Sequence, residues 1–139
     1  MSSSVAVLLA LLALPLLGLA GCGLNEQSPD LFVLTRTGQG QSLTLLVNDG
    51  GTIRCNGGAS KSLPDPMLLV ARDLANSLNS DAKAKLRIPA GAGTVFSYTV
   101  KLSDGTISFP DTAARSRNDL AQAEQFALQA AQGPCGLSG

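Results

Sequence analysis

The sequence predicts an α+β fold, in which an antiparallel sheet of about five strands carries two helices on one face. Short runs rich in β-forming residues are separated by turns that contain Gly, which is the pattern of β-hairpins. Each group of such runs is followed by one stretch whose apolar residues recur at the helical period. Because the strands are grouped before each helix, the order favours two strand-strand-helix units over a parallel α/β sheet.

The first unit is predicted to begin with three short strands separated by two tight turns. The turns lie at residues 38–40 and 48–51, where Gly, Asn and Asp gather. Residues 56–62, which are polar and rich in Gly and Ser, indicate a loop after the third strand. The strands themselves are predicted at residues 31–37, 42–47 and 52–55.

A helix is predicted to follow, beginning at Asp65 and Pro66 and ending at residues 79–81. Asp is a preferred capping residue, and Pro suits the first helical position because its missing N–H would have no partner there. The stripe of this helix that should face the core consists of Met67, Val70, Ala71, Leu74 and Leu78.

The second unit begins after residues 81–93, which are rich in basic residues, Pro and Gly and are predicted to form an exposed connector. Strands are predicted at 95–102 and 106–109, joined by an Asp-Gly turn. Residues 116–119 match a capping box at the start of the second helix. Its apolar stripe consists of Leu120, Ala123, Phe126, Ala127 and Ala130.

The first 21 residues are excluded from this fold because they resemble a secretory signal peptide. None of them carries a charged side chain, and the apolar run at 5–20 is shorter than the roughly 20 residues needed to cross a bilayer core. Residues 22–30 are predicted to be a polar tether, and residues 31–139 a single α+β domain.

The end of this segment, Leu19-Ala20-Gly21-Cys22, resembles the lipobox of bacterial lipoprotein signal peptides. The resemblance implies that Cys22 is the lipidation site, that the chain is cleaved just before it, and that the new amino terminus is acylated. Two or three acyl chains anchor a protein stably, whereas one does not. The expected location is therefore the outer, extracytoplasmic face of the cell membrane, with membrane lipid contacted through Cys22.

The two remaining cysteines, Cys55 and Cys135, are predicted to form a disulfide. An even pair in an oxidising compartment favours this pairing. Zinc is a weaker interpretation, because two cysteines in a chain without histidine cannot supply the usual four ligands. Two free thiols remain the alternative.

The amino-acid composition excludes several classes of catalytic and binding site. The chain has no histidine, which excludes Ser-His-Asp and Cys-His nucleophiles and H-E-x-x-H metal sites. Its net charge of zero argues against a nucleic-acid partner. We therefore expect no catalytic residue, no cofactor and no metal, and a protein that is not an enzyme. The basic residues Lys83, Lys85 and Arg87 are expected to be solvated, with contact to anionic lipid head groups as the alternative.

Two patterns could still suggest catalysis. Asp49 and Asp104 occupy equivalent turns of the two units and could act as paired carboxylates, although Asp before Gly is also a common turn residue. Ser80 and Lys83 have the S-x-x-K spacing of a Ser-Lys nucleophile but lack the companion motifs. The structural interpretation is favoured for both.

Aromatic residues in the second unit are expected to belong to the core of the sheet. Phe96, Tyr98 and Phe109 fall in the two predicted strands and alternate with polar residues. This spacing favours a buried face over a ligand-binding surface.

The chain from the tether to the last cysteine resembles a set of uncharacterised actinobacterial lipoproteins, a resemblance that implies no activity. It is carried by residues 30–38, 55–57 and 104–106, and by Leu63, Pro64, Ser97, Tyr98, Ser108, Phe109, Asp111, Thr112 and Cys135.

A smaller set of residues resembles emfourin-type inhibitors of thermolysin-like proteases. Arg36-Thr37-Gly38 in the first strand is followed by a Leu-Pro helix start and by a hairpin before the last helix. The family's Gly-Gly is absent because Gln39 follows Gly38, so no functional residue is transferred.

Together these observations predict a membrane-anchored lipoprotein that binds a protein or small-molecule partner without catalysing a reaction. An inhibitor of a secreted metalloprotease and a hydrolase that uses carboxylates are the alternatives.

Overall fold

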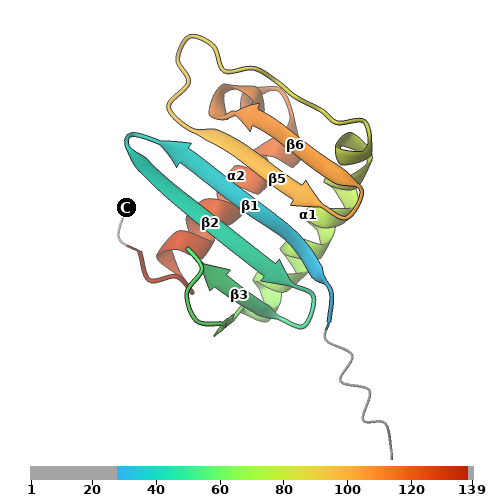
Figure 1. Cartoon of the computed structure of the whole chain (residues 1–139), viewed down its shortest axis with the longest axis vertical. Helices are drawn as coiled ribbons and strands as arrows, with labels where there is room; N and C mark the ends of the chain where they lie inside the picture. Colours follow the sequence, from blue (N-terminus) through green and yellow to red (C-terminus); the bar gives the residue numbers. More distant parts are fainter. Residues whose placement is uncertain (1–27, 138–139) are drawn as a thin grey trace, which may run out of the picture.

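Residues 28–137 are described by a computed structural model, in which six antiparallel strands form one sheet with both helices on the same face (Figure 1). The predicted α+β class is confirmed, with six strands rather than about five. The predicted signal peptide, Cys22 and most of the tether lie outside the described residues. The sheet order is β4-β3-β2-β1-β5-β6, so that the first strand of the chain lies in the interior of the sheet.

The strands agree closely with their predicted positions, apart from one short addition. A two-residue strand, β4, lies within the segment expected to be a loop, where Lys61 pairs with Ile53 and Ser62 with Thr52. The strands are β1 Asp30–Gly38, β2 Gln41–Asn48, β3 Thr52–Cys55, β4 Lys61–Ser62, β5 Ser97–Leu102 and β6 Gly105–Pro110.

The two units do not contain the strands that were predicted for them, because β1 is shared between them. The elements β2, β3 and β4 lead to helix α1, and β5 and β6 lead to helix α2. The two sets lie on opposite sides of β1, which pairs with β2 on one side and with β5 on the other. The two units therefore correspond to two arms of the sheet that flank a shared strand, β1.

Helix α1, Asp65–Lys83, begins where predicted and extends slightly further. Pro64 rather than Asp65 occupies the N-cap position, and no side chain caps the helix, so the predicted capping role of Asp65 is wrong. Ala71, Leu74 and Leu78 are buried as expected, but Val70 is 38% exposed. The buried stripe of α1 is therefore narrower than predicted.

The connector after α1 is less exposed than the sequence suggested. Leu86 and Ile88 are half-buried against the core. The amide of Ser108 in β6 donates to the Leu86 carbonyl, and the Ile88 amide donates to the Ser108 carbonyl. The segment therefore covers the edge of β6, which would otherwise present unpaired backbone groups.

Helix α2, Asn118–Gln132, follows a 3-10 helix, η1, at Asp111–Arg115 that was not predicted. The capping box expected at residues 116–119 is absent, because Arg117 occupies the N-cap position and no side chain caps the helix. Asp119 is instead paired with Arg117, which also binds Asp81 of α1. These hydrogen bonds raise the pKa of the Arg117 guanidinium and tie the start of α2 to the end of α1.

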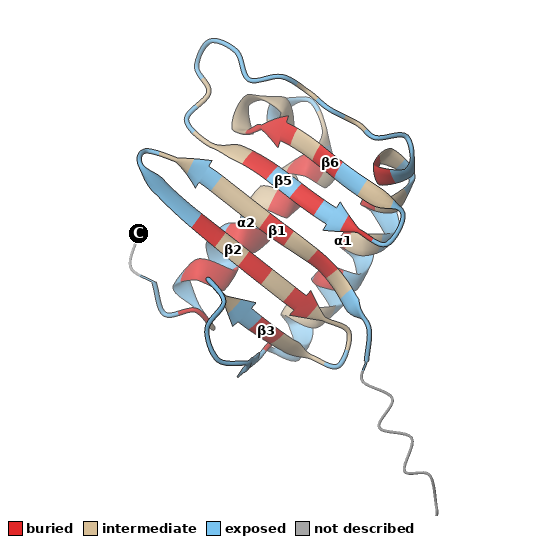
Figure 2. Ribbon diagram, in the orientation of Figure 1, coloured by how far each residue is buried: buried red, intermediate tan, exposed pale blue. Residues whose placement is uncertain are grey.

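The core lies between the sheet and the two helices (Figure 2). Phe32 of β1 meets Phe126 of α2 edge-on, with ring centroids 5.6 Å apart. All five apolar residues predicted for the stripe of α2 are buried. The opposite face of the sheet is open and carries polar and charged side chains such as those of Thr99, Lys101 and Arg54, all exposed.

A disulfide joins Cys55 at the end of β3 to Cys135 just after α2, with 5.8 Å between the Cα atoms. The predicted pair is therefore bonded in this structure. The bridge fastens the segment after α2 to the sheet at Cys55, which pairs with Leu45 in the middle of β2.

Candidate functional site

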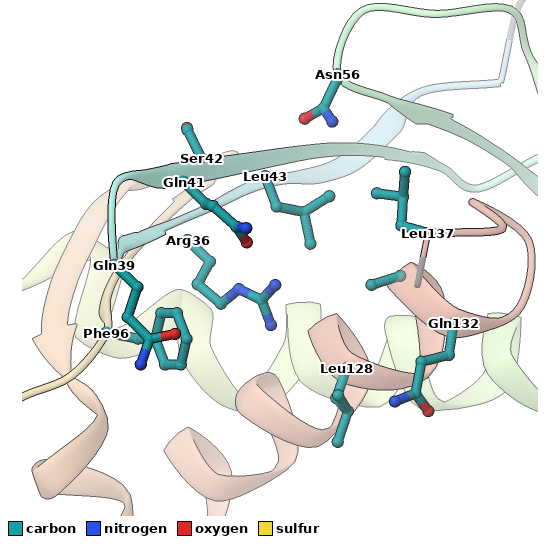
Figure 3. Close-up of a pocket in the computed structure, with 11 residues that line it drawn as sticks. Arg36, Gln39, Gln41, Ser42, Leu43, Asn56, Phe96, Leu128, Gln132 and Leu137 are labelled. Carbon is teal, nitrogen blue, oxygen red and sulfur yellow. The ribbon is translucent and has the colours of Figure 1, made fainter. Parts of the chain in front are cut away.

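A pocket of about 540 Å³ lies at one end of the molecule, between the β1–β2 hairpin, the last turns of α2 and the chain after Cys135 (Figure 3). Pockets of this size accommodate small organic ligands. The lining combines one cation, four apolar side chains, four amides and two small residues: Arg36, Leu43, Phe96, Leu128, Leu137, Gln39, Gln41, Asn56, Gln132, Ser42 and Ala131.

Arg36 is the charged residue of this lining. It belongs to β1 and lies opposite Tyr98 of β5 and Leu43 of β2. Its guanidinium carbon is 4.9 Å from the centroid of the Phe96 ring, in cation–π geometry. No carboxylate of residues 28–137 lies within ion-pairing distance of it. Arg36 therefore presents a positive charge to the pocket that a ligand could neutralise.

Apolar side chains border the same opening. Leu128 of α2 is 42% exposed, and Leu137 of the terminal segment is 40% exposed. Figure 3 shows these residues on the far side of the cavity from the hairpin, with the Arg36 side chain extending between them and the sheet. The pocket thus offers an apolar wall beside a cation, which suits a ligand with an apolar body and a negative group.

The hairpin that closes the pocket has a strained turn. Gln39 has a φ of +53° and Gly40 a φ of +71°, the left-handed pair required by a type I′ turn. The left-handed region costs a residue with a Cβ roughly 1 kcal/mol. This turn places the Gln39 amide at the rim, where it could bind a ligand.

Ionisable side chains lie on the helix side of the sheet, next to Arg36. Burial raises the pKa of Tyr98 to about 12, and the Glu124 carboxylate adds to the rise while Arg36 opposes it. Burial also raises the pKa of Glu124 to about 7, with a smaller contribution from Asp111. The Glu124 Oε1 atom is covered and has no hydrogen-bond partner among residues 28–137. Asp111 accepts hydrogen bonds from the backbone amides of Val95 and Phe96.

Glu124 should make the stability of the protein depend on pH. Because its folded-state pKa of about 7 lies above its ordinary value, the folded state holds the proton more tightly, and the stabilisation present below pH 4.5 is lost as the pH rises through 7. Glu124 is partly exposed, so we expect a loss of only about 1 kcal/mol in the free energy of unfolding. No histidine titrates in this window.

Urea unfolding at pH 5 and pH 8 would measure this dependence. Glu124→Gln should be more stable than the parent protein at pH 8 and should lack the decline between the two values. A parent protein equally stable at both pH values would contradict the assignment to Glu124.

The two turn carboxylates, those of Asp49 and Asp104, are each held by a side chain of α1. The Arg72 Nε donates to the Asp49 Oδ1 over 2.6 Å, and the Asn79 Nδ2 donates to the Asp104 Oδ2 over 2.7 Å. Arg72 and Asn79 lie two turns apart on the helix, which separates the two contacts by about 10 Å. The structure thus uses each aspartate to fasten a hairpin turn to α1.

The remaining patterns singled out in the sequence lie away from the pocket. Ser80 and Lys83 lie in the last turns of α1 rather than in a loop, and both are exposed. Lys85 and Arg87 are also exposed, and Arg87 forms a single bridge to Ser108. None of these residues lines the pocket described above.

Of the three aromatic residues expected in the core of the sheet, two are buried there and one, Phe96, is not. Tyr98 and Phe109 are buried and stacked, with ring centroids 5.2 Å apart. Phe96 is half-buried, precedes β5 and faces the pocket, so its assignment to the sheet core is corrected. The strand begins at Ser97, two residues later than its alternating pattern suggested.

Residues 28–137 contain neither a cluster of metal ligands nor a helix that could cross a membrane. No group of three or more His, Cys, Asp or Glu residues there could hold a metal ion. Neither helix in that range is long and apolar enough to cross a membrane.

Arg36 was not identified as a candidate binding residue from the sequence. Its chemistry depends on the absence of a nearby carboxylate, which a sequence does not show. A usable signal was that Arg36 falls on the inward-facing side of the β1 alternation, with Phe32 and Leu34. A charged residue at such a position requires either a partner or an opening to solvent.

Residues 28–137 thus form a small α+β domain with a partly apolar cavity that is lined by one cationic side chain, that of Arg36. No protein-family model matches the chain, and no curated protein or solved structure is significantly similar to it.

Proposed function

We propose that this chain is a membrane-anchored extracytoplasmic lipoprotein that acts as a binding module, and that its partner binds in the pocket beside Arg36. The observation that carries the proposal is a guanidinium without a carboxylate partner in the described residues, stacked on Phe96 inside a cavity of about 540 Å³. An unpaired charge in a partly covered site is costly unless a ligand or water satisfies it.

The proposed location rests on two separate features. Leu19-Ala20-Gly21-Cys22 follows an apolar run of signal-peptide length, and a disulfide between Cys55 and Cys135 suits an oxidising compartment. The pocket is lined by residues of the hairpin and the terminal segment rather than by the first residues of the domain. A lipid anchor ahead of residue 30 would therefore leave the pocket accessible.

Crosslinking on intact cells with a membrane-impermeant reagent would test both parts of the proposal. Arg36→Gln should remove the crosslinked partner, whereas Arg54→Gln, on the open face of the sheet, should retain it. Cys22→Ala should abolish incorporation of an alkyne-labelled fatty acid, whereas Asn25→Ala, in the same tether, should not. Capture that does not depend on Arg36 would overturn the proposed site, and acylation of the Cys22→Ala variant would overturn the proposed anchor.

A further inference from the structure

Helix α1 begins with an apolar surface that faces solvent. Pro66, Leu69 and Val70 are exposed and share one face of the first two turns, because residues three and four positions apart are neighbours on a helix. Leu69 is 60% exposed, the highest value for a large apolar side chain in residues 28–137. It points away from the core, because it lies roughly 200° around the helix from the buried Ala71. We call Pro66, Leu69 and Val70 the apolar tip of α1.

The apolar tip lies at the end of the domain where the chain enters the sheet. The backbone amide of Asp49 donates to the Pro29 carbonyl over 2.9 Å, which binds the start of the domain to the turn between β2 and β3. Asp49 also accepts a hydrogen bond from Arg72 of α1, and the Leu68 side chain lies against Gly51 of the same turn. Figure 1 shows the start of β1 and helix α1 at the same end of the sheet, away from the β1–β2 hairpin.

The proposed lipid anchor would confine this end of the domain to the bilayer. Cys22 and Ser28 are six positions apart, a length of chain that reaches at most about 20 Å when fully extended. The Asn48 side chain donates to the Ser28 carbonyl, so this segment starts from a fixed point on the domain. A lipid on Cys22 would therefore hold the apolar tip within reach of the membrane surface.

We propose that the apolar tip of α1 contacts the lipid bilayer as a second, non-covalent membrane attachment. This inference rests on the proposed lipid anchor and gives the orientation of the anchored domain. Leu69 and Val70 enter the interfacial layer of the bilayer, as the apolar side chains of surface-bound helices do. The pocket beside Arg36 adjoins the β1–β2 hairpin at the other end of the domain and therefore faces away from the membrane.

The proposed contact is apolar rather than electrostatic. Asp65 and Asp73 border the tip and are exposed, and the nearby Arg72 is already paired with Asp49. Anionic head groups would be repelled by the two free carboxylates, so the tip fits a zwitterionic lipid such as phosphatidylcholine better. Because salt screens only the attraction between charges, the contact should persist at high ionic strength.

A lipid surface suits the size of this patch better than a protein partner does. Three side chains cover far less than the roughly 800 Å² that each partner contributes to a stable protein interface. Their contact with a bilayer is also weak, but a short tether raises its effective concentration to roughly the millimolar range. The anchor thus makes a weak contact persistent, and the unlipidated Cys22→Ala variant should not bind vesicles.

Quenching of a site-specific fluorophore by labelled lipid would test the inference. The lipidated full chain, with an NBD dye on a Leu69→Cys substitution, is placed on phosphatidylcholine vesicles. Only the introduced thiol reacts with the dye, because Cys22 carries the lipid and Cys55 is bonded to Cys135. Phosphatidylcholine with a doxyl group on its acyl chain should quench about half of the fluorescence. A label on Leu128→Cys is the matched control and should keep its intensity, because Leu128 is 42% exposed but lies beside the pocket.

A second set of variants separates the effect of the tip from that of the dye. An NBD label on Asp65→Cys, directly before Pro66, should also be quenched. Adding Leu69→Ser and Val70→Ser should reduce this quenching about threefold, because the apolar contact is lost. Adding Leu128→Ser instead should leave the quenching unchanged. Thermal unfolding of each variant would show that the fold persists.

Four outcomes would overturn the inference. Protein that floats with the vesicles but shows no quenching at Leu69 would refute the contact and leave the anchor in place. Protein that does not float would refute the anchor and the contact together. Equal quenching at Leu69 and Leu128 would show that the domain has no fixed orientation. A blue shift at Leu69 without quenching, together with crosslinks between copies, would assign the tip to a second copy of this chain.

Discussion

Removing the disulfide should lower the free energy of unfolding by about 4 kcal/mol, which is a large share of the stability of a small domain. The bridge joins residues that are 80 positions apart. A link across so long a loop restricts the unfolded chain strongly, and the magnitude follows from that restriction. In a domain of roughly 110 residues, such a loss corresponds to a fall of more than 10 °C in Tm.

The double variant Cys55→Ala and Cys135→Ala should show this loss in urea unfolding, and reduction of the parent protein should reproduce it. The reduced fold should keep its helices, because backbone hydrogen bonds from Cys135 to Ala130 and from Leu137 to Ala131 still hold the terminal segment. A loss below 1 kcal/mol would show that the bridge constrains the unfolded state little.

The strands and the buried stripe of α2 could be predicted because they depend on local patterns. A hairpin turn such as Ser103-Asp104-Gly105 shows where one strand ends and that it pairs with the next strand. The alternation of apolar and polar residues shows which face of a strand is buried. The two-residue β4 could not be predicted, because Lys61 and Ser62 have no strand preference of their own. They form a strand because β3 lies beside them and pairs with them. The caps of both helices were wrongly predicted, and at the start of α2 the side chain expected to cap the helix, that of Asp119, instead binds Arg117.

The candidate site was harder to predict than the fold because its parts are distant in the chain. Arg36, Phe96 and Leu128 come from β1, the connector and α2, and they meet only after the sheet and helix have packed. Asp49 and Asp104 stood out in the sequence, yet their role in the structure is to bind Arg72 and Asn79. Conspicuous turn residues were therefore poorer guides to the site than an arginine in an inward-facing strand position.

Gly38→Ala should destabilise the protein by about 3 kcal/mol and disturb the pocket at the same time. A Cβ at this position would lie 2.3 Å from the Val95 carbonyl oxygen and 2.6 Å from Cδ1 of Phe96, on a backbone with a φ of +156°. The β1 strand and the segment before β5 approach too closely here for any side chain. Relief of the contact would displace the ring on which Arg36 lies.

Gly40→Ala provides the matched control, because it lies in the same hairpin and has a φ of +71° but no atom within 4 Å of its Cβ position. Its cost should be limited to backbone strain of about 1 kcal/mol. The difference between the two variants in urea unfolding therefore isolates the contact with Val95 and Phe96. Gly38→Ala should also weaken Arg36-dependent partner capture, whereas Gly40→Ala should preserve it. Equal losses of stability in both variants would show that backbone strain alone is responsible and that the hairpin does not hold Phe96 in place.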